Sequence, residues 1–449
     1  MLSNIVMLNF KNLWLRASLW LLALGPGFFL IYGSVNHFTA AREAVPSLYL
    51  NFEHSIPVIP WHILPYMLLD LMFAASLYMC RSITELDQHA KRLMSSILLA
   101  ATCFLLWPLK FGFERPQLDG FWGVLHRQLI EFDLPYNQAP SLHIILLIVV
   151  AIVFLRHLPR WLAVPTLVWS AIICISVLTT HQHHLIDVVT AVPVTLFIIC
   201  LFPNNQLPVT DFRKVCAHEL SHWVGYLYAV LSVSCFIVGA VLGYWGMLLA
   251  LPGMACALMA AAYLWRDERL LNKRTDGSIP WHVKVILFPV VMTQTLYKNW
   301  YTNKVSAVDE IIDGIYIARR LTSNEFSHQV TTNKIKTLFD VAPEFAAPSI
   351  PHGVNYIALN WLDLAPVSKH QLNTCADALA QAINNGSVLI ECKLGLQRSV
   401  LVLLAYLIKY KNMTVEQAYE LIAKKRQGAV LRPKQITILE DLIITLKER

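Results

Sequence analysis

Long apolar runs fill the first 265 residues of this chain, and no other feature restricts its fold as strongly. About 20 helical residues cross a bilayer core of roughly 30 Å. Hydrophobic residues make up 56% of the sequence and charged residues 14%, against roughly 25% charged residues in an average soluble domain. The sequence therefore predicts an all-α membrane bundle over residues 1–270. Its expected spanning stretches, about eight, lie near 17–35, 57–79, 93–110, 141–156, 160–180, 184–203, 223–242 and 245–265.

Lysine and arginine between these stretches predict the orientation of the bundle, because both residues resist translocation in short loops. Most fall on one side, and the opposite side holds Arg42, Lys110, Arg115 and Arg127. We therefore expect a multi-pass protein of a bacterial-type inner membrane with both termini in the cytoplasm. This distribution explains the net charge of +7 without a nucleic-acid partner. Residues 281–300 are expected to lie in the membrane interface, within a linker over 271–302.

Three polar clusters are expected to meet at the non-cytoplasmic face of the bundle. They are Lys110 with Arg115, Ser141 with His143, and His183 with Asp187. Forty residues separate the two histidines, which is the length needed to cross the membrane and return. Ionisable groups at such depth are costly and usually functional. Together these groups can neutralise a phosphate, accept a phosphoryl group and protonate a leaving oxygen.

The three clusters resemble the type 2 phosphatidic acid phosphatase superfamily over roughly residues 90–205. The family pattern is Lys-x6-Arg-Pro, Pro-Ser-Gly-His and Ser-Arg-x5-His-x3-Asp, and this chain has KFGFERP, APSLH and SVLTTHQHHLID. The resemblance implies that His183 is the nucleophile, that Asp187 holds its ring and that His143 is the general acid. It also implies that Lys110, Arg115 and Ser141 bind the phosphate.

Three departures from that pattern leave the reaction of the bundle open. Four rather than six residues separate Lys110 from Arg115, Leu142 replaces the glycine, and Val177 replaces the arginine of the third motif. The last two changes resemble the branch that contains sphingolipid head-group transferases. Transfer to an alcohol therefore competes with hydrolysis, and polar capping of helix ends is the structural alternative.

The HELSH segment, with His218, Glu219 and His222, matches the HExxH pattern of zinc sites. No convincing third ligand follows it, so we interpret it as an interfacial helix start. The nine cysteines form no CxxC pair, and no nucleotide-binding loop is recognised. We therefore expect no metal and no other cofactor, and no feature indicates an oligomeric state.

After about residue 303, short strands alternate with amphipathic helices, which predicts a soluble α/β domain over 303–449. The expected strands are GIYIA, KTLFDVA, NYIALN and SVLIE, and the expected helices lie near 369–384, 399–410, 414–425 and 433–446. Between SVLIE and the following helix, Cys392 and Arg398 form a Cys-x5-Arg motif. A strand-to-helix loop of this kind can direct backbone N–H groups at a phosphate. The same field favours a nucleophilic thiolate.

This domain resembles the dual-specificity protein tyrosine phosphatase family from DEIIDGIYIA to its last helix. The resemblance implies that Cys392 forms a phosphocysteine and that Ser399 eases departure of the thiolate. Arg398 and Gly395 are implied to hold the phosphate, and Asp363, 29 residues before the cysteine, is implied as the general acid. Glu391 departs from the family, which usually has histidine there, and its charge is expected to oppose both the thiolate and the substrate.

Both halves of the chain point to phosphoryl groups. The expected function is an integral membrane phosphatase that hydrolyses phosphomonoesters, with phospholipids or other membrane-borne phosphoesters as substrates. One alternative is a lipid head-group phosphotransferase in the bundle. The other is a sensor or scaffold whose C-terminal pocket binds phosphoryl groups without turnover, and Glu391 is its main support.

Overall fold

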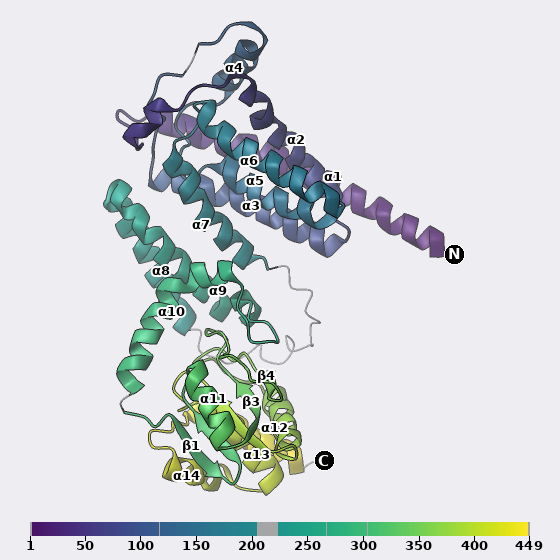
Figure 1. Cartoon of the computed structure of the whole chain (residues 1–449), viewed down its shortest axis with the longest axis vertical. Coiled ribbons are helices and arrows are strands. Elements are labelled where there is room, and N and C mark those ends of the chain that lie inside the picture. Colours follow the sequence, from purple (N-terminus) through teal and green to yellow (C-terminus); the bar gives the residue numbers. More distant parts are fainter. Residues whose placement is uncertain (1, 116, 204–222, 266, 303, 448–449) are drawn as a thin grey trace. The chain divides into compact units, whose positions relative to one another are not determined.

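The computed structural model describes residues 2–115, 117–203, 223–265, 267–302 and 304–447 (Figure 1). The chain divides into two compact units. One contains residues 1–204 and 233–254, and the other contains residues 205–232 and 255–449. The helices α8 (Trp223–Val241) and α9 (Ala250–Leu264) each contribute residues to both units. No single point of the chain therefore separates them.

The first unit is a bundle of apolar helices. It contains α1 (Leu2–Ala40), α2 (Ile63–Met79), α3 (Ile83–Leu106), α4 (Gly120–Phe132), α5 (Leu142–His157), α6 (Ala163–Thr179) and α7 (Leu185–Leu201). Helix α5 is central, since α2, α3, α6 and α7 all pack against it. The amphipathic helix α4 was not expected, because its hydrophobic residues are too few for a spanning segment.

Each of the eight stretches expected to span overlaps a helix of the structure. Six helices in the described part of the chain have the length and hydropathy to cross a membrane, at 12–40, 60–79, 83–106, 160–179, 223–241 and 243–264. The helices α5 and α7 are apolar but shorter, at 16 and 17 residues. By their length and composition, these six helices could span a membrane.

A single helix, α10 (Trp281–Thr302), occupies the segment that was expected to be interfacial. It is not among the six helices that meet the criteria for spanning. One face buries Val283, Ile286, Leu287 and Val290 within the second unit. The helix thus has one packed face, and large apolar side chains along the rest of it are exposed.

A five-stranded sheet with the order β1-β2-β5-β3-β4 forms the centre of the C-terminal domain. The strands are β1 (Val308–Ile312), β2 (Ile315–Ala318), β3 (Ile335–Asp340), β4 (Asn355–Ala358) and β5 (Ser387–Glu391). All neighbouring strands run parallel except β1 and β2. The edge strand β1 was not expected, because two acidic residues interrupt its apolar pattern. Charged residues are common on edge strands, where they oppose pairing with another chain.

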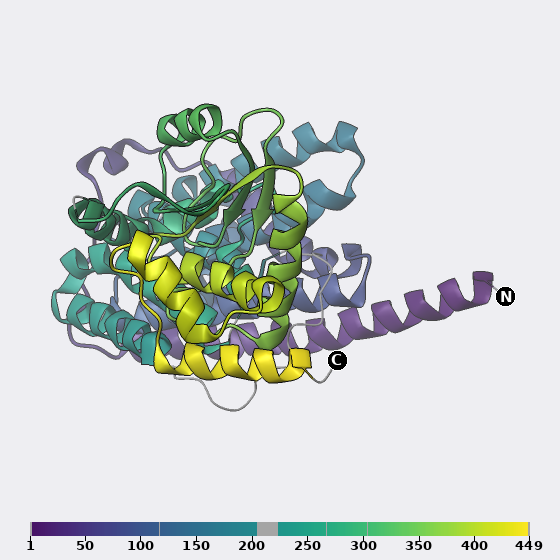
Figure 2. The same ribbon diagram turned by 90° about the horizontal axis from the view of Figure 1, so that it is seen from below.

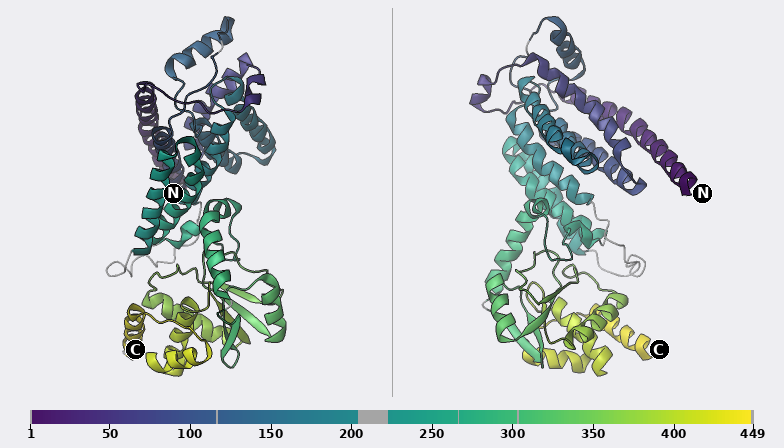
Figure 3. Two further views of the ribbon diagram at one scale, coloured as in Figure 1. Left: turned by 90° about the vertical axis from the view of Figure 1, so that its left-hand side faces the viewer. Right: turned by 45° about the vertical axis from the view of Figure 1, so that its right-hand side comes forward.

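Helices cover both faces of this sheet (Figure 3). On one face α11 (Ser323–Thr332) places Phe326 against Leu338 and Leu389. The other face carries α12 (Lys369–Ile383), α13 (Arg398–Lys411), α14 (Val415–Lys425) and α15 (Pro433–Lys447), which Figure 2 shows in yellow-green to yellow. Val388 and Ile390 face this second layer, so alternate residues of the central strand β5 serve two cores.

Candidate active sites

The Cys-x5-Arg loop begins where the central strand β5 ends and finishes where α13 begins. Cys392 follows the strand directly, and Arg398 is the first residue of the helix. In sheets of parallel strands, ligands bind at the carboxyl ends of the strands. The buried Cys392 sulfur accepts a hydrogen bond from the backbone N–H of Gly395, with 3.2 Å between nitrogen and sulfur. The loop therefore curls back over its own cysteine.

Arg426, which is fully buried at the end of α14, shapes this loop from behind. Its guanidinium donates to the carbonyl oxygens of Leu394 and Gly395 at 2.9 and 3.1 Å. Because the C=O and N–H of a peptide unit point in opposite directions, this arrangement turns the adjoining N–H groups toward the cysteine. Gly395 has a φ of +69°, and a Cβ there would lie 2.5 Å from the carbonyl oxygen of Ala318. Glycine is thus required in this loop for both conformation and space.

Glu344 holds the Arg398 guanidinium in place, and the sequence analysis missed it. Its two carboxylate oxygens accept from Arg398 at 3.0 and 2.6 Å, and the Trp361 carbonyl accepts at 2.9 Å. Burial opposes the charged form of Arg398, but the carboxylates of Glu344 and Asp363 raise its pKa well above the ordinary value. Arg398 therefore stays charged at this position, with a fixed orientation. Glu344 lies in the loop after β3, where its sequence carries no motif.

Asp363 lies beside the cysteine loop, as its expected role requires. Its carboxylate accepts a hydrogen bond from Lys393 at 2.9 Å and lies 3.4 Å from Arg398 Nε. Burial raises the pKa of Asp363, but the positive charges of Arg398 and Lys393 outweigh burial and lower it. The carboxyl group is thus ionised beside these two cations. A phosphate dianion bound to Arg398 would oppose this ionisation and favour the acid form.

A pocket of about 400 Å³ opens over these residues. Asp363, Cys392 and Arg398 all line it, whereas Ser399 lies behind the loop, fully buried. Two tyrosines of α10, Tyr297 and Tyr301, form part of the wall. Sequence analysis missed them because they precede the domain and belong to no motif. The remaining lining residues are Leu364, Lys393, Leu394, Leu396, Gln397, Val430 and Arg432.

The carboxylate of Glu391 is turned away from this pocket, contrary to the expectation that it opposes the thiolate. It accepts a hydrogen bond from Arg320 at 2.8 Å and another from the backbone N–H of Leu321 at 3.3 Å. Arg320 also contacts Asp340, which in turn accepts from Lys273 at 2.6 Å. Burial raises the pKa of Glu391 to about 7, against the effect of Arg320. Glu391 therefore belongs to a buried network of charged residues at the carboxyl ends of β5 and β3.

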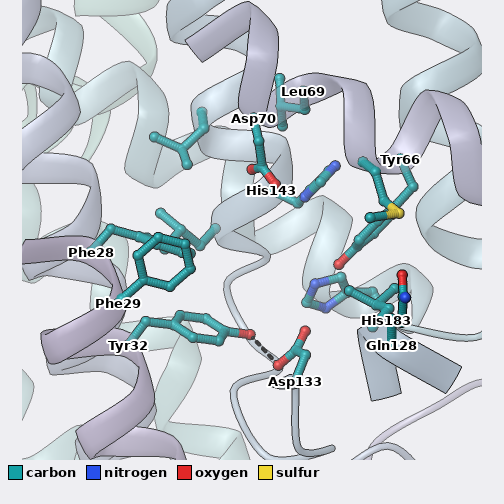
Figure 4. Close-up of a pocket in the computed structure, with 14 residues that line it drawn as sticks. Phe28, Phe29, Tyr32, Tyr66, Leu69, Asp70, Gln128, Asp133, His143 and His183 are labelled. Atoms are coloured by element: carbon teal, nitrogen blue, oxygen red, sulfur yellow. Dashed lines mark hydrogen bonds between the residues drawn. The ribbon is translucent and has the colours of Figure 1, made fainter. Parts of the chain in front are cut away.

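The helical bundle of the first unit contains a separate cavity of about 210 Å³, drawn in Figure 4. Both His143 and His183 line it, together with Tyr66, Asp70 and Asp133. The remaining lining residues are Phe28, Phe29, Tyr32, Met67, Leu69, Gln128, Leu129, Leu142 and Leu146. The ring of Tyr66 stacks on that of His143, with centroids 4.0 Å apart. Histidines that are forty residues apart in the sequence thus meet at one cavity.

Asp187 contacts His183 in the way that the resemblance implied. Its Oδ2 lies 3.3 Å from His183 Nδ1 and accepts the backbone N–H of His184 at 2.8 Å. The Asp187 carbonyl accepts the backbone N–H of Ser141 at 2.9 Å, which joins the start of α5 to that of α7. Among the described residues, Ser141 Oγ and His143 Nε2 are buried without a hydrogen-bond partner. His143 lines the cavity, so its Nε2 is available to a bound group, whereas Ser141 is not among the lining residues.

Neither of the two cations expected at this cavity lines it. Arg115 donates to the carbonyl oxygen of Asp133 and does not line the cavity, and the side chain of Lys110 is exposed to solvent. The loop that carries them is held by His184, whose Nε2 accepts the backbone N–H of Gly112 at 2.9 Å. Glu53 was not singled out from the sequence, and it contacts His184 Nδ1 at 2.9 Å. The HELSH segment, His218 to His222, lies outside the described residues.

Comparison with known proteins assigns the C-terminal domain. Residues 315–442 match the family model described as dual specificity phosphatase, catalytic domain. Dual specificity protein phosphatase 1B of Arabidopsis thaliana is 29% identical over 136 residues, which are 30% of this chain and 80% of that protein. Phosphatidylglycerophosphatase and protein-tyrosine phosphatase 1 of Rattus norvegicus is 43% identical over 54 residues, 12% of this chain and 28% of that protein.

Other matches have the same limited extent. MAP kinase phosphatase with leucine-rich repeats protein 3 of Dictyostelium discoideum is 27% identical over 147 residues, 32% of this chain and 16% of that protein. The chain thus spans less than a third of two of these three curated relatives. The crystal structure of PTPMT1 is 22% identical and covers 32% of this chain and 97% of its own, with a TM-score of 0.29. The family model and the Arabidopsis thaliana relative therefore identify residues 315–442 as a dual-specificity phosphatase catalytic domain.

Proposed function

We propose that the protein is an integral membrane phosphatase whose Cys392 pocket hydrolyses phosphomonoesters carried by membrane lipids. The observation that carries this proposal is the convergence of Cys392, Arg398 and Asp363 on one pocket. Glu344 orients the arginine from outside the pocket, so the site is preorganised for a tetrahedral anion. Glu391 does not support a pocket that only binds, because its carboxylate is paired with Arg320.

Hydrolysis proceeds in two steps at these residues. The Cys392 thiolate attacks phosphorus, the bond from phosphorus to the ester oxygen breaks, and Asp363 gives its proton to that oxygen as the alcohol leaves. A water molecule then attacks the phosphocysteine, Asp363 takes back a proton, and the thiolate leaves as inorganic phosphate forms. Arg398 and the loop N–H groups hold the phosphoryl oxygens throughout. Ser399, next to the loop, is proposed to stabilise the departing thiolate.

The helix α10 supports a lipid as the carrier of the phosphate. Tyr297 and Tyr301 line the pocket on this helix. Exposed apolar side chains follow one another along it at helical spacing, at Trp281, Phe288, Met292, Leu296 and Trp300. Tryptophan and tyrosine favour the interface between water and lipid, where such a helix buries its apolar face. A pocket with a wall on this helix would open at the level of lipid head groups.

The name of the rat relative, a phosphatidylglycerophosphatase, also supports a lipid substrate. The test compares full-length protein in vesicles that contain phosphatidylglycerophosphate with its activity on a soluble phosphotyrosyl peptide. We expect at least about tenfold higher kcat/KM for the lipid, since the surface raises its local concentration. Phe288→Glu with Leu296→Glu should reduce the lipid activity and leave a soluble aryl phosphate unaffected. Equal kcat/KM values for the lipid in vesicles and for the peptide would exclude a preference for lipid substrates.

We propose a second phosphoryl-transfer site at the cavity of the bundle, where His183 is the nucleophile. The contact of its Nδ1 with Asp187 leaves Nε2 as the attacking atom, and His143 is near enough to line the same cavity as a general acid. The hydroxyl of Ser141, two residues before His143, has no hydrogen-bond partner among the described residues and is proposed to donate to a phosphoryl oxygen, although Ser141 does not line the cavity. Phosphohistidine would then react with water, which gives hydrolysis, or with an alcohol, which gives head-group transfer.

Product analysis separates these two outcomes at the bundle. A panel of lipids labelled in the phosphate is supplied in vesicles to wild type and to His183→Ala. Free labelled phosphate that requires His183 indicates hydrolysis, and a new labelled lipid indicates transfer. If His183→Ala and His143→Ala give the wild-type products at the wild-type rate, the bundle has no such site. The cavity is then a packing feature of the helices.

The bundle is proposed to cross an inner membrane with eight helices and to keep both termini in the cytoplasm. The six long apolar helices and the shorter α5 and α7 support this count. A cytoplasmic location would also keep Cys392 reduced. Impermeant thiol labelling of single cysteines introduced at Asp313 and Asn51 tests the arrangement. Only the cysteine at position 51 should react with the reagent from the non-cytoplasmic side of intact cells.

A further inference from the structure

We propose that Tyr263, on the apolar helix α9, is a positioning residue for the general acid of the Cys392 site. This inference rests on the proposed function of that site. The hydroxyl of Tyr263 donates to the backbone carbonyl of Asp363, with 2.8 Å between the oxygens. Tyr263 belongs to a helix with the length and hydropathy of a membrane span, whereas Asp363 belongs to the phosphatase domain. This hydrogen bond therefore joins the apolar helix α9 to the loop of the phosphatase domain that carries Asp363.

The loop that carries Asp363, residues 361–364, is called the acid loop here, and its backbone is also attached within the catalytic domain. The Trp361 N–H donates to the Val341 carbonyl at 2.9 Å, and the Trp361 carbonyl accepts from Arg398 at 2.9 Å. Beyond Asp363 the chain turns sharply at Leu364, whose φ of +60° is uncommon for a residue other than glycine. The hydroxyl of Tyr263 holds the loop between these fixed and strained positions. It therefore acts on the peptide group that carries the acid itself.

Tyr263 is itself held by neighbouring helices. Its ring stacks on that of Tyr228 from α8, with centroids 5.9 Å apart and an angle of 26° between the planes. The hydroxyl of Tyr228 lies 3.4 Å from Nε2 of Gln294 on α10, the helix that also lines the pocket. Three helices that precede the phosphatase domain thus converge on one tyrosine. The position of the acid loop depends on how these helices pack.

The segment that follows α9 is hydrogen-bonded to the loop of the phosphatase domain that contains Glu344. Lys273 donates to the Ala342 carbonyl at 2.6 Å, and the Gly277 carbonyl accepts from Ala347 at 2.8 Å. Both contacts flank Glu344, the residue that orients Arg398. The end of α9 is therefore fastened near both catalytic loops, so that Tyr263 has a defined place from which to act.

The physical consequence concerns proton transfer and not phosphate binding. A general acid contributes when its proton lies within hydrogen-bond reach of the leaving oxygen, and a misplacement of about 1 Å removes much of that contribution. Tyr263 does not line the pocket and does not contact the phosphate loop in any bond that the structure describes. Loss of its hydroxyl should therefore affect substrates in proportion to their need for a proton.

The experiment measures kcat/KM of the full-length protein in detergent for two phosphomonoesters. One is para-nitrophenyl phosphate, whose phenolate leaves readily without a proton, and the other is glycerol 3-phosphate, whose alkoxide requires one. For Tyr263→Phe we expect about a tenfold loss on the alkyl ester and less than about twofold on the aryl ester. Equal losses on the two substrates, or no loss on either, would overturn the inference.

A double-mutant cycle provides the second readout. If Tyr263 acts through the acid, Tyr263→Phe in an Asp363→Asn background should cause less than about a twofold further loss. Independent, multiplicative losses would contradict this. Tyr410→Phe is the matched control, because it removes a tyrosine hydrogen bond to Asp377 on the far helices of the same domain. It should leave both kcat/KM values unchanged.

Cys392→Ser distinguishes failure of the inference from failure of the proposed function. If it eliminates activity on both esters while Tyr263→Phe matches wild type, the phosphatase function stands and the positioning role is wrong. If both esters are still cleaved at the wild-type rate by Cys392→Ser in a His183→Ala background, the proposed function of the pocket fails, and the positioning role fails with it.

Discussion

The Cys392 pocket and the cavity beside His183 manage charge in different ways. At the first, Arg398 is paired with Glu344, and Asp363 is paired with Lys393. At the second, Asp70 and Asp133 line the cavity, while the two cations expected there do not. A preorganised anion site needs positive groups aimed inward. The first site therefore directs a positive group at the phosphate position, whereas no lysine or arginine lines the second.

This difference follows from how the two sites are encoded. The cysteine loop takes its nucleophile, its arginine and its backbone donors from one continuous strand-to-helix segment. The bundle cavity takes its residues from loops and helices spread over more than a hundred positions. A contiguous motif restricts geometry within itself, whereas a dispersed one depends on the packing of every helix between. Substitutions at each site test whether the two sites act on phosphoesters independently of each other.

The largest expected effect separates the two nucleophiles. Cys392→Ser should lower phosphate release from a soluble aryl phosphate by at least about 10³-fold, because serine lacks the reactive thiolate. His183→Ala should leave this activity unchanged, since its cavity lies in a different unit. Colorimetric phosphate release from purified full-length protein measures both. Loss of the aryl phosphatase activity in His183→Ala would end the separation of the two sites.

Removal of the charge that orients Arg398 should have the next largest effect. Glu344→Gln keeps the size of the side chain but weakens the paired contact at 2.6 and 3.0 Å. We expect kcat/KM to fall about 10²-fold through misorientation of the guanidinium. The control is Glu416→Gln on α14, an exposed residue away from the pocket. If Glu344→Gln retains wild-type kcat/KM, the arginine does not depend on this partner.

Glu391→Gln should change activity less than about threefold but alter how stability depends on pH. Burial raises the pKa of Glu391 from 4.5 to about 7, so the folded state retains a proton that the unfolded state releases. Stability should therefore fall as the pH rises from about 4.5 to about 7, by on the order of 1–3 kcal/mol. The Glu391→Gln variant should lack this pH-dependent loss of stability.

Thermal unfolding followed by tryptophan fluorescence between pH 5 and pH 8 measures this effect. Asp340 shares the network, but Arg320 and Lys273 outweigh burial and lower its pKa, so its loss of stabilisation occurs at more acidic pH. The two contributions are thus separated. If stability depends on pH in the same way in wild type and in Glu391→Gln, Glu391 does not titrate in this range.

The smallest expected effect concerns the bundle. Lys110→Ala should change any activity that depends on His183 less than about twofold, because the lysine is exposed and does not line the cavity. The resemblance to type 2 phosphatidic acid phosphatases implies the opposite. Lipid product analysis in vesicles decides between them. A loss as large as that of His183→Ala would indicate that the loop carrying Lys110 closes over the cavity when substrate binds.

Much of the C-terminal fold could be predicted from the sequence. The strands β2, β3, β4 and β5 and the four last helices lie close to their expected positions, because alternating apolar residues and capping residues mark them. The strand β1 and the helix α11 were missed, since both are polar and short. Three members of the C-terminal site, Cys392, Arg398 and Asp363, were also identified from the sequence, and the structure brings them together at one pocket.

The apolar helices and the Cys-x5-Arg loop could be predicted because periodicity and motif spacing are local properties of the chain. The pairing of Glu391 with Arg320, the contact of Glu344 with Arg398 and the bond from Tyr263 to the acid loop became apparent only in the folded structure. These contacts join residues 54 to 100 positions apart. A side chain's charge can be known from the sequence, but its counter-charge is selected by packing, since only the fold brings distant segments within a few ångströms.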